Sequence, residues 1–229
     1  MNWKTYALEF ASVFIAVVAA FALNNWNDNR RDAVAESKIL REIRNGLLKD
    51  KEDIVHNLAG HGSGVMACEA WHAYLTDRPV NKDSLVIHYA KLLRDFVSIQ
   101  NRAGYESLKS KGLETIKDDS LRLAVIDIYE YDFNVLITLE EDYYASQFYQ
   151  NYFTAMNDAI VPWATFDSAG NMVGLLPEAQ FDTVQTKALL SYLWRVRMER
   201  RFIMEFYRTV DLKIDRIVAQ IDRVAPREN

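Results

Sequence analysis

An apolar run near the start of the chain constrains the fold more than any other feature. Residues 10–23 are all apolar or small, and Ser12 carries the only hydroxyl group among them. As a helix this run would be about 21 Å long, shorter than the roughly 30 Å hydrocarbon core of a bilayer, so its flanks must complete a span. The run therefore predicts one transmembrane helix over residues 6–26.

Aromatic residues flank the run on both sides. Trp3 and Tyr6 precede it, and Trp26 follows it. Tyr6 and Trp26 would be about 30 Å apart along a helix, which matches the spacing of the two membrane interfaces where such residues concentrate. We expect residues 1–27 to form a transmembrane anchor and residues 28–229 to form a soluble helical bundle domain.

Two other readings of the run compete with a retained anchor. Ala20-Phe21-Ala22 fits the pattern of a signal-peptide cleavage site. Glu9 at the start of the apolar stretch and the weakly basic N-terminal region argue against cleavage. A buried helix of a soluble protein is the third reading. We favour the retained anchor.

Small residues recur on one face of the predicted span. Ser12, Ala16 and Ala20 follow four-residue spacing, which lets two transmembrane helices approach closely. Glu9 and Asn24 extend the same face by one turn at each end, and an ionisable group inside a span usually faces protein or water. This face predicts packing against another helix. The alternative is that Glu9 reaches the headgroups and that alanine is merely common.

Two segments resemble a known family. The first comprises Glu9, the apolar run and Asn24-Asn25-Trp26-Asn27-Asp28, followed by basic residues; the second holds Tyr105, Leu108 and Gly112. They resemble a family of uncharacterised bacterial single-span membrane proteins, a domain of unknown function, whose members open with a Glu-led apolar run ending in Ile-Asn-Asn-Trp-Asn-Glu. Leu and Asp stand here in place of that Ile and Glu. The resemblance implies a single-pass protein of the bacterial inner membrane and no known activity.

Two features of the sequence conflict over which side of the membrane the soluble domain occupies. Lys4 is the only basic residue before the run, whereas Arg30, Arg31, Lys38 and Arg41 follow it closely. This asymmetry alone favours a cytoplasmic domain. The resembling family implies an exported domain, and we expect the soluble part to be periplasmic.

The remainder of the chain predicts an all-α fold, with an up-down bundle of long helices after the anchor. The sequence holds 8 glycines and 4 prolines in 229 residues, too few for the many turns of a sheet-rich fold. A break is expected at residues 59–63, and residues 160–181 could form a small hairpin. The expected helices cover residues 28–58 in continuation of the span, then 64–76, 83–96, 102–111, 118–158 and 183–224.

The last of these helices has the clearest apolar pattern. A 4-3 repeat, typical of a coiled-coil seam, runs along it with Arg200 as its one charged member. Helix 118–158 is acidic, with Arg122 its only base, and is expected to be its neighbour. We predict Glu140 or Asp132 as the partner of Arg200 in a buried ion pair. The positions of the repeat are Leu189, Leu193, Val196, Arg200, Ile203, Tyr207, Val210, Ile214, Ile217, Ile221 and Val224.

Two clusters could carry chemistry. Cys68 and His72, at i and i+4 on one helix face, could hold two metal ligands, but no third ligand is evident, and we favour an ordinary buried cysteine. Tyr144, Phe148 and Tyr152 could line an aromatic pocket for an apolar ligand. Packing in the core is the alternative, and the one we favour.

The charge and the missing motifs narrow the classes of function that the chain could have. The net charge is -5 and the first 27 residues contribute none of it, which argues against binding of nucleic acid by the soluble part. The chain has no dinucleotide-binding, P-loop, nucleophile-elbow or Cys-x-x-Cys motif. We therefore expect no catalysis, no cofactor and no metal.

Two hypotheses remain. The first is a membrane-anchored helical interaction module, an accessory or sensory subunit of a membrane protein complex, whose partners are membrane lipid and either further copies or another membrane subunit. The second is a membrane-tethered domain that binds a small ligand or performs metal-dependent catalysis.

Overall fold

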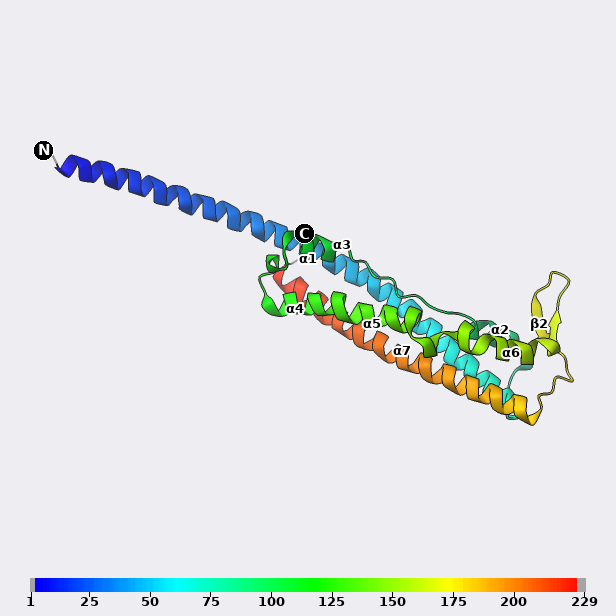
Figure 1. The fold of residues 1–229 in the computed structure, drawn as a ribbon. Coiled ribbons are helices and arrows are strands. Elements are labelled where there is room, and N and C mark those ends of the chain that lie inside the picture. The colour runs from blue at the N-terminus through cyan, green and yellow to red at the C-terminus, as the bar shows by residue number, and fades with distance from the viewer. Residues whose placement is uncertain (1–2, 226–229) are drawn as a thin grey trace.

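The first helix of the molecule is one continuous rod. The computed structural model describes the backbone of residues 3–225 and the side chains of residues 7–225. In it α1 (Trp3–Leu75) runs for 73 residues without interruption (Figure 1), a length of about 110 Å at the helical rise. The expected break at residues 59–63 is therefore wrong. Glycine in a helix costs only about 1 kcal/mol relative to alanine, and here close packing compensates for it.

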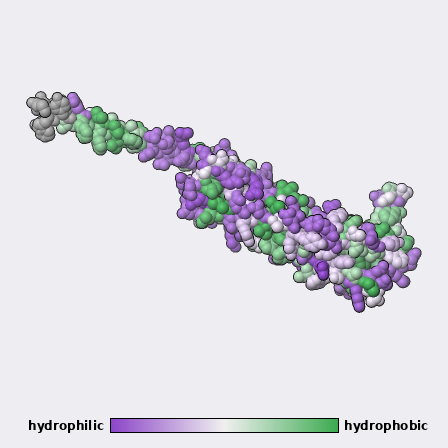
Figure 2. Space-filling model, in the orientation of Figure 1, coloured by the Kyte–Doolittle hydropathy of each residue, from purple (hydrophilic) through white to green (hydrophobic). Residues whose placement is uncertain are grey.

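The N-terminal part of α1 stands outside the folded body. Every described residue from 7 to 34 is exposed, and close packing begins at Ile39. Figure 2 shows this part as a thin extension with an apolar section followed by a polar one. It is the one helix among the described residues that is long and apolar enough to cross a membrane.

The body is built from three helical segments that lie along one another, and we call them the three legs. The remainder of α1 forms the first leg, α7 forms the last, and the shorter helices between residues 119 and 160 form the middle leg (Figure 1). Two short helices lie on α1 before the middle leg begins. The bounds are α2 (Leu85–Leu92), α3 (Ala103–Lys111), α4 (Asp119–Asp127), α5 (Phe133–Ile137), α6 (Thr154–Ile160), β1 (Ala164–Phe166), β2 (Met172–Leu175) and α7 (Thr183–Val224).

The middle leg is not the single helix predicted for residues 118–158. Its hydrogen bonding changes to the wider π pattern at Ile128–Asp132, Thr138–Asp142 and Tyr149–Phe153. Between the last two π segments the chain leaves the helix, and Tyr143 and Gln147 have extended backbones. Such π segments are rare, and they occur often at functional sites.

The C-terminal helix follows its predicted pattern closely. It begins after Asp182, which forms a capping box with Gln185. All members of the predicted repeat from Leu189 to Ile221 are buried, and only Val224 is exposed. The repeat packs mainly against α1, with the acidic middle leg as a second neighbour. The charge argument thus identified a neighbour of α7 but missed the principal one.

The predicted hairpin is present at the end of the body that lies far from the exposed N-terminal part of α1 (Figure 1). Its strands β1 and β2 are antiparallel, with Thr165 opposite Gly174. Asp167 accepts backbone hydrogen bonds from Ala169 and Asn171 in the turn. Gly170 has φ of 84°, a conformation that glycine adopts without strain.

The apolar core is divided into two clusters along the bundle. The cluster nearer the exposed N-terminal part of α1 contains Ile43, Tyr129 and Ile214, and the farther one contains Trp71 and Leu193. Polar residues occupy the level between them on all three legs, and this level forms the candidate site.

Candidate functional site

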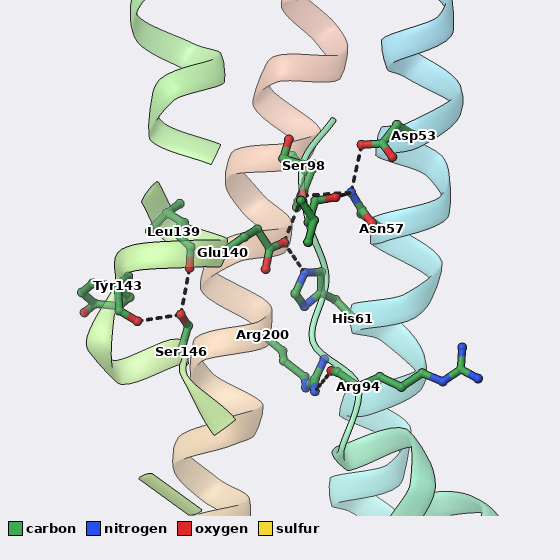
Figure 3. Close-up of polar contacts among 12 residues, drawn as sticks. Asp53, Asn57, His61, Arg94, Ser98, Leu139, Glu140, Tyr143, Ser146 and Arg200 are labelled. Atoms are coloured by element: carbon green, nitrogen blue, oxygen red, sulfur yellow. Dashed lines mark hydrogen bonds and ion pairs between the residues drawn. The ribbon is translucent and has the colours of Figure 1, made fainter. Parts of the chain in front are cut away.

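A layer of buried polar side chains crosses the bundle between the two apolar clusters. His61 from α1 and Glu140 from the middle leg point toward each other (Figure 3), with 2.7 Å between His61 Nε2 and Glu140 Oε1. The hydroxyl of Tyr207 on α7 donates to the same carboxylate oxygen at 2.9 Å. The three residues are 2%, 9% and 0% exposed. One oxygen atom therefore joins the three legs of the body.

The protonation of Tyr207 is settled by its surroundings. Burial raises the pKa of its hydroxyl well above the usual range, and the charge of Glu140 raises it further. Tyr207 thus remains a hydrogen-bond donor to the carboxylate at every physiological pH.

The layer extends along α1 toward the N-terminal end of this helix. The side-chain nitrogen of Asn57 lies 3.1 Å from the Tyr207 hydroxyl, 3.0 Å from Asp53 Oδ2 and 3.1 Å from the Val97 carbonyl oxygen. Asp53 also accepts from the backbone N–H of Ile99 at 3.1 Å. These bonds fix the extended segment after α2 to the surface of α1.

The interrupted middle leg places Glu140 in the interior. Its freed backbone carbonyls are satisfied by nearby side chains, as a buried helix end requires. Ser146 Oγ donates to the carbonyls of Leu139 at 2.8 Å and Tyr143 at 2.7 Å (Figure 3). Gln147 Nε2 donates to the carbonyl of Glu140 at 2.9 Å. The break is therefore held in a defined conformation by side-chain hydrogen bonds.

Two glycines of α1 make room for the layer. A Cβ atom at Gly60 would lie 2.1 Å from the ring of Phe96, and one at Gly64 would lie 2.6 Å from Arg200 Nε. Real Cβ atoms do not approach other atoms so closely. Gly60, which belongs to the predicted helix break, and Gly64 therefore serve close packing.

Arg200 is buried on the seam as predicted, but its partners differ. Its guanidinium donates to the carbonyls of Leu92 at 3.2 Å and Arg94 at 2.9 Å, and it stacks 5.6 Å from the centre of the Phe96 ring. Burial lowers its pKa, and nearby carboxylates oppose this effect. The predicted ion pair is wrong because the guanidinium donates to backbone carbonyls, while Glu140 Oε1 is hydrogen-bonded to His61 and accepts from Tyr207.

Asp132, the other predicted partner of Arg200, belongs to a different ion pair. It lies at the side of the bundle where Lys213 Nζ approaches its carboxylate at 2.7 Å. Lys213 also contacts Asp127 at 3.0 Å. This pair links the acidic middle leg to α7, as the charge pattern indicated, although through lysine and not arginine.

A small cavity adjoins the layer. It has a volume of about 20 Å³, room for one water molecule, and its walls include His61, Glu140 and Arg200. His61 Nδ1 and Arg200 Nε have no hydrogen-bond partner among the described residues. The space beside the His61 and Glu140 pair is too small for an organic substrate.

Cys68 and His72 line one small cavity together with residues of α7. Cys68 is buried, and burial raises the pKa of its thiol to about 11. His72 Nδ1 is 2.5 Å from the guanidinium of Arg78. Among the described residues no group of three or more histidine, cysteine or acidic side chains could hold a metal ion.

The predicted aromatic pocket is divided between core and surface. Phe148 and Tyr152 are buried in the farther apolar cluster, whereas Tyr144 is 69% exposed. Tyr152 donates to the carbonyl of Ala145 at 3.2 Å, which holds the break in place. Phe148 and Tyr152 line the 20 Å³ cavity beside the polar layer, whereas Tyr144 lies on the surface, because the chain leaves the helix between Tyr144 and Phe148.

The residues of the predicted packing face all lie on the exposed part of α1. The Ser12 hydroxyl donates to the Glu9 carbonyl at 2.8 Å, and Asn24 donates to Asp28 at 3.0 Å, so these polar groups are satisfied within the helix. Ala16 and Ala20 lie between them on the same exposed stretch.

The interface aromatics are described only in part. The guanidinium of Arg30 lies 5.9 Å from the ring of the exposed Trp26. Trp3 and Tyr6 belong to the backbone of α1, and their side chains lie outside the described residues.

Sequence reasoning missed His61 and Tyr207 as members of one site. The available signal was the single charge in the apolar repeat of α7, because a buried arginine implies further polar groups at the same level. Gly60 and Gly64 on either side of His61 were a second signal.

Comparison of the chain with protein-family models, with curated proteins and with solved structures found no match.

Proposed function

We propose that the protein is a membrane-anchored helical interaction module, an accessory or sensory subunit of a membrane protein complex with no reaction of its own. The observation that carries this proposal is the continuity of α1. One unbroken helix exposes an apolar section over residues 10–23 and then supplies His61 to the buried polar layer. A displacement at the layer would therefore move the exposed section as well.

The anchor belongs to the proposal. A contiguous exposed apolar surface on a soluble protein marks contact with lipid or another protein. The internal hydrogen bonds of Ser12 and Asn24 suit a segment that lies in lipid, where every polar group needs a partner. We propose that residues 6–26 span a bacterial inner membrane once, as the family resemblance implies, and that an up-down bundle follows in the periplasm.

The packing face supplies the proposed contact with a partner. Ala16→Leu would fill the space that a second helix needs, and Glu9→Ala would remove the polar contact at one end. Ala11→Leu is the matched control, because residue 11 lies on the opposite side of the helix. We expect the first two variants to weaken assembly and the control to retain it.

The test is crosslinking and native mass measurement of the full chain in detergent. A chain that stays monomeric, with no co-purifying protein, would contradict the proposal. Fusion of a periplasmic or cytoplasmic reporter to the C-terminus assigns the side of the membrane independently of assembly.

A further inference from the structure

A groove between α1 and the segment that follows it has the character of a small-molecule site. It has a volume of about 460 Å³, within the range of roughly 300–1,000 Å³ that is usual for such sites. Its apolar lining comes from Ala59 and Gly60 of α1, from Ile87 and Ala90 of α2, and from Phe96. The apolar surface suits the hydrocarbon or aromatic part of a ligand.

Apart from Ser63, the polar side chains that line the groove are basic. His56, Lys91 and Arg94 line it, and no carboxylate does. The Arg94 side chain extends away from the buried layer while its carbonyl faces Arg200 (Figure 3). The charge of Lys91 contributes, after burial, to lowering the pKa of the neighbouring His88. A groove lined by one sign of charge attracts the opposite sign.

The groove shares a wall with the buried polar layer. Arg94 and Phe96 line both this groove and the 20 Å³ cavity beside Glu140. The centre of the Phe96 ring lies 4.7 Å from the centre of the His61 ring and 5.6 Å from the Arg200 guanidinium. A ligand that contacts Phe96 from the groove therefore contacts the layer through a single side chain.

We infer that this groove binds a small amphiphilic anion, with a carboxylate or phosphate group between Lys91 and Arg94 and an apolar body over Phe96. Binding would displace Phe96 against His61 and so reach α1, which leads to the exposed apolar section. The inference deepens the proposed function, because it names the class of ligand that a sensory subunit would detect.

Calorimetric titration of the full chain in lipid nanodiscs tests the inference, with empty nanodiscs as the blank. The probes are octanoate and octyl phosphate, compared with octanol and octylamine, which have the same tail and no negative charge. We expect either anion to bind at least about tenfold more tightly than octanol. The anion that binds more tightly identifies the head group. Equal binding of octanol and the anions would overturn the inference.

Variants locate the site on the chain. The double variant Lys91→Glu with Arg94→Glu is expected to weaken anion binding at least about tenfold. Ala90→Trp, at an exposed position of the wall, is expected to block the groove without disturbing the core. Lys49→Glu is the control, because this exposed residue lies on α1 away from the groove. Wild-type binding by both Ala90→Trp and the double variant would overturn the inference.

Two measurements separate this inference from the proposed function. The ring nitrogen resonances of His61 should shift when octanoate is added to the wild-type chain and not when it is added to Ala90→Trp. Absence of anion binding in a chain that still assembles would overturn the inference alone. Anion binding by a chain that is strictly monomeric would overturn the proposed assembly and leave the groove intact.

Discussion

The two parts of α1 form one regular helix and differ in what surrounds them. Residues 7–34 are exposed along their whole circumference, including Phe14 and Ile15. Residues 39–71 alternate buried and exposed positions with helical periodicity, and Ile43 is fully buried. The backbone of both parts is satisfied by the same internal hydrogen bonds. Helical geometry is therefore independent of the surroundings, and only the side chains show which part has protein around it.

Truncation of one isoleucine in each part should give the largest contrast. Ile43→Ala leaves a cavity in the core and should cost about 2–5 kcal/mol of unfolding free energy. Ile15→Ala removes a side chain that is 65% exposed and touches no core. Its effect on unfolding of the body should stay within about 0.5 kcal/mol. Chemical denaturation followed by circular dichroism measures both, and equal losses would contradict the comparison.

Removal of the Glu140 carboxylate tests how much the polar layer contributes to the unfolding free energy of the body. Glu140→Ala leaves His61 Nε2 and the Tyr207 hydroxyl without their acceptor. At about 1–3 kcal/mol for each orphaned donor, we expect a loss of about 3 kcal/mol. The exposed neighbour Glu141 provides the control, and Glu141→Ala should change the unfolding free energy by less than about 0.5 kcal/mol. Similar unfolding midpoints for the two variants would show that the layer contributes little.

Asp50 gives the buried part of α1 a pH-dependent contribution to stability. It is 3% exposed on the buried part of α1, and burial raises its pKa from 3.8 to about 6. The folded state therefore binds its proton more tightly than the unfolded state does. The associated stability is fully present below pH 3.8 and is lost as the pH rises past about 6.

Asp50→Asn should consequently stabilise the protein at pH 8. The pKa shift corresponds to about 2–3 kcal/mol, and the gain should shrink toward zero near pH 4. The amide oxygen of asparagine can still accept the Asn101 N–H bond, which measures 2.7 Å to Asp50 Oδ1. Unfolding curves of the wild type and the variant across this pH range provide the measurement. A difference that does not change with pH would contradict the prediction.

Two neighbouring glycines provide the smallest contrast. Gly60→Ala should destabilise the body by about 1–3 kcal/mol, because its Cβ would overlap the Phe96 ring. Gly62→Ala meets only the end of Met204 at 3.9 Å, so it should stabilise the helix by about 0.5–1 kcal/mol. Thermal unfolding shifts of opposite sign are expected. Shifts of the same sign would show that Phe96 does not pack on α1 as described.

Patterns confined to one helix were read reliably from the sequence. The repeat on α7 was predicted residue by residue, and only Val224 differs. The hairpin and the long apolar N-terminal helix also appear where they were expected. These features depend on the spacing of apolar residues along one element and on local turn residues, which the sequence states directly.

Features that depend on contacts between residues distant in the sequence could not be predicted in the same way. Gly60 looks like a helix break until Phe96 is known to pack on it, and Arg200 looks like half of an ion pair until backbone carbonyls are known to reach it. The break before Phe148 depends on Ser146 and Gln147 bonding to carbonyls that an ordinary helix would occupy. In each case the local structure depends on a contact with residues outside the segment whose apolar spacing was analysed.

The sequence by itself determined that the protein is helical, that an exposed apolar helix opens it and which face of its last helix is buried, because apolar spacing sets these properties within each element. The tertiary structure alone decided that His61, Glu140 and Tyr207 meet at one oxygen atom and that Arg94 and Phe96 separate that layer from a basic groove. Such meetings depend on how three legs align in space, and residues some 70 to 150 positions apart carry no mark of it in the sequence.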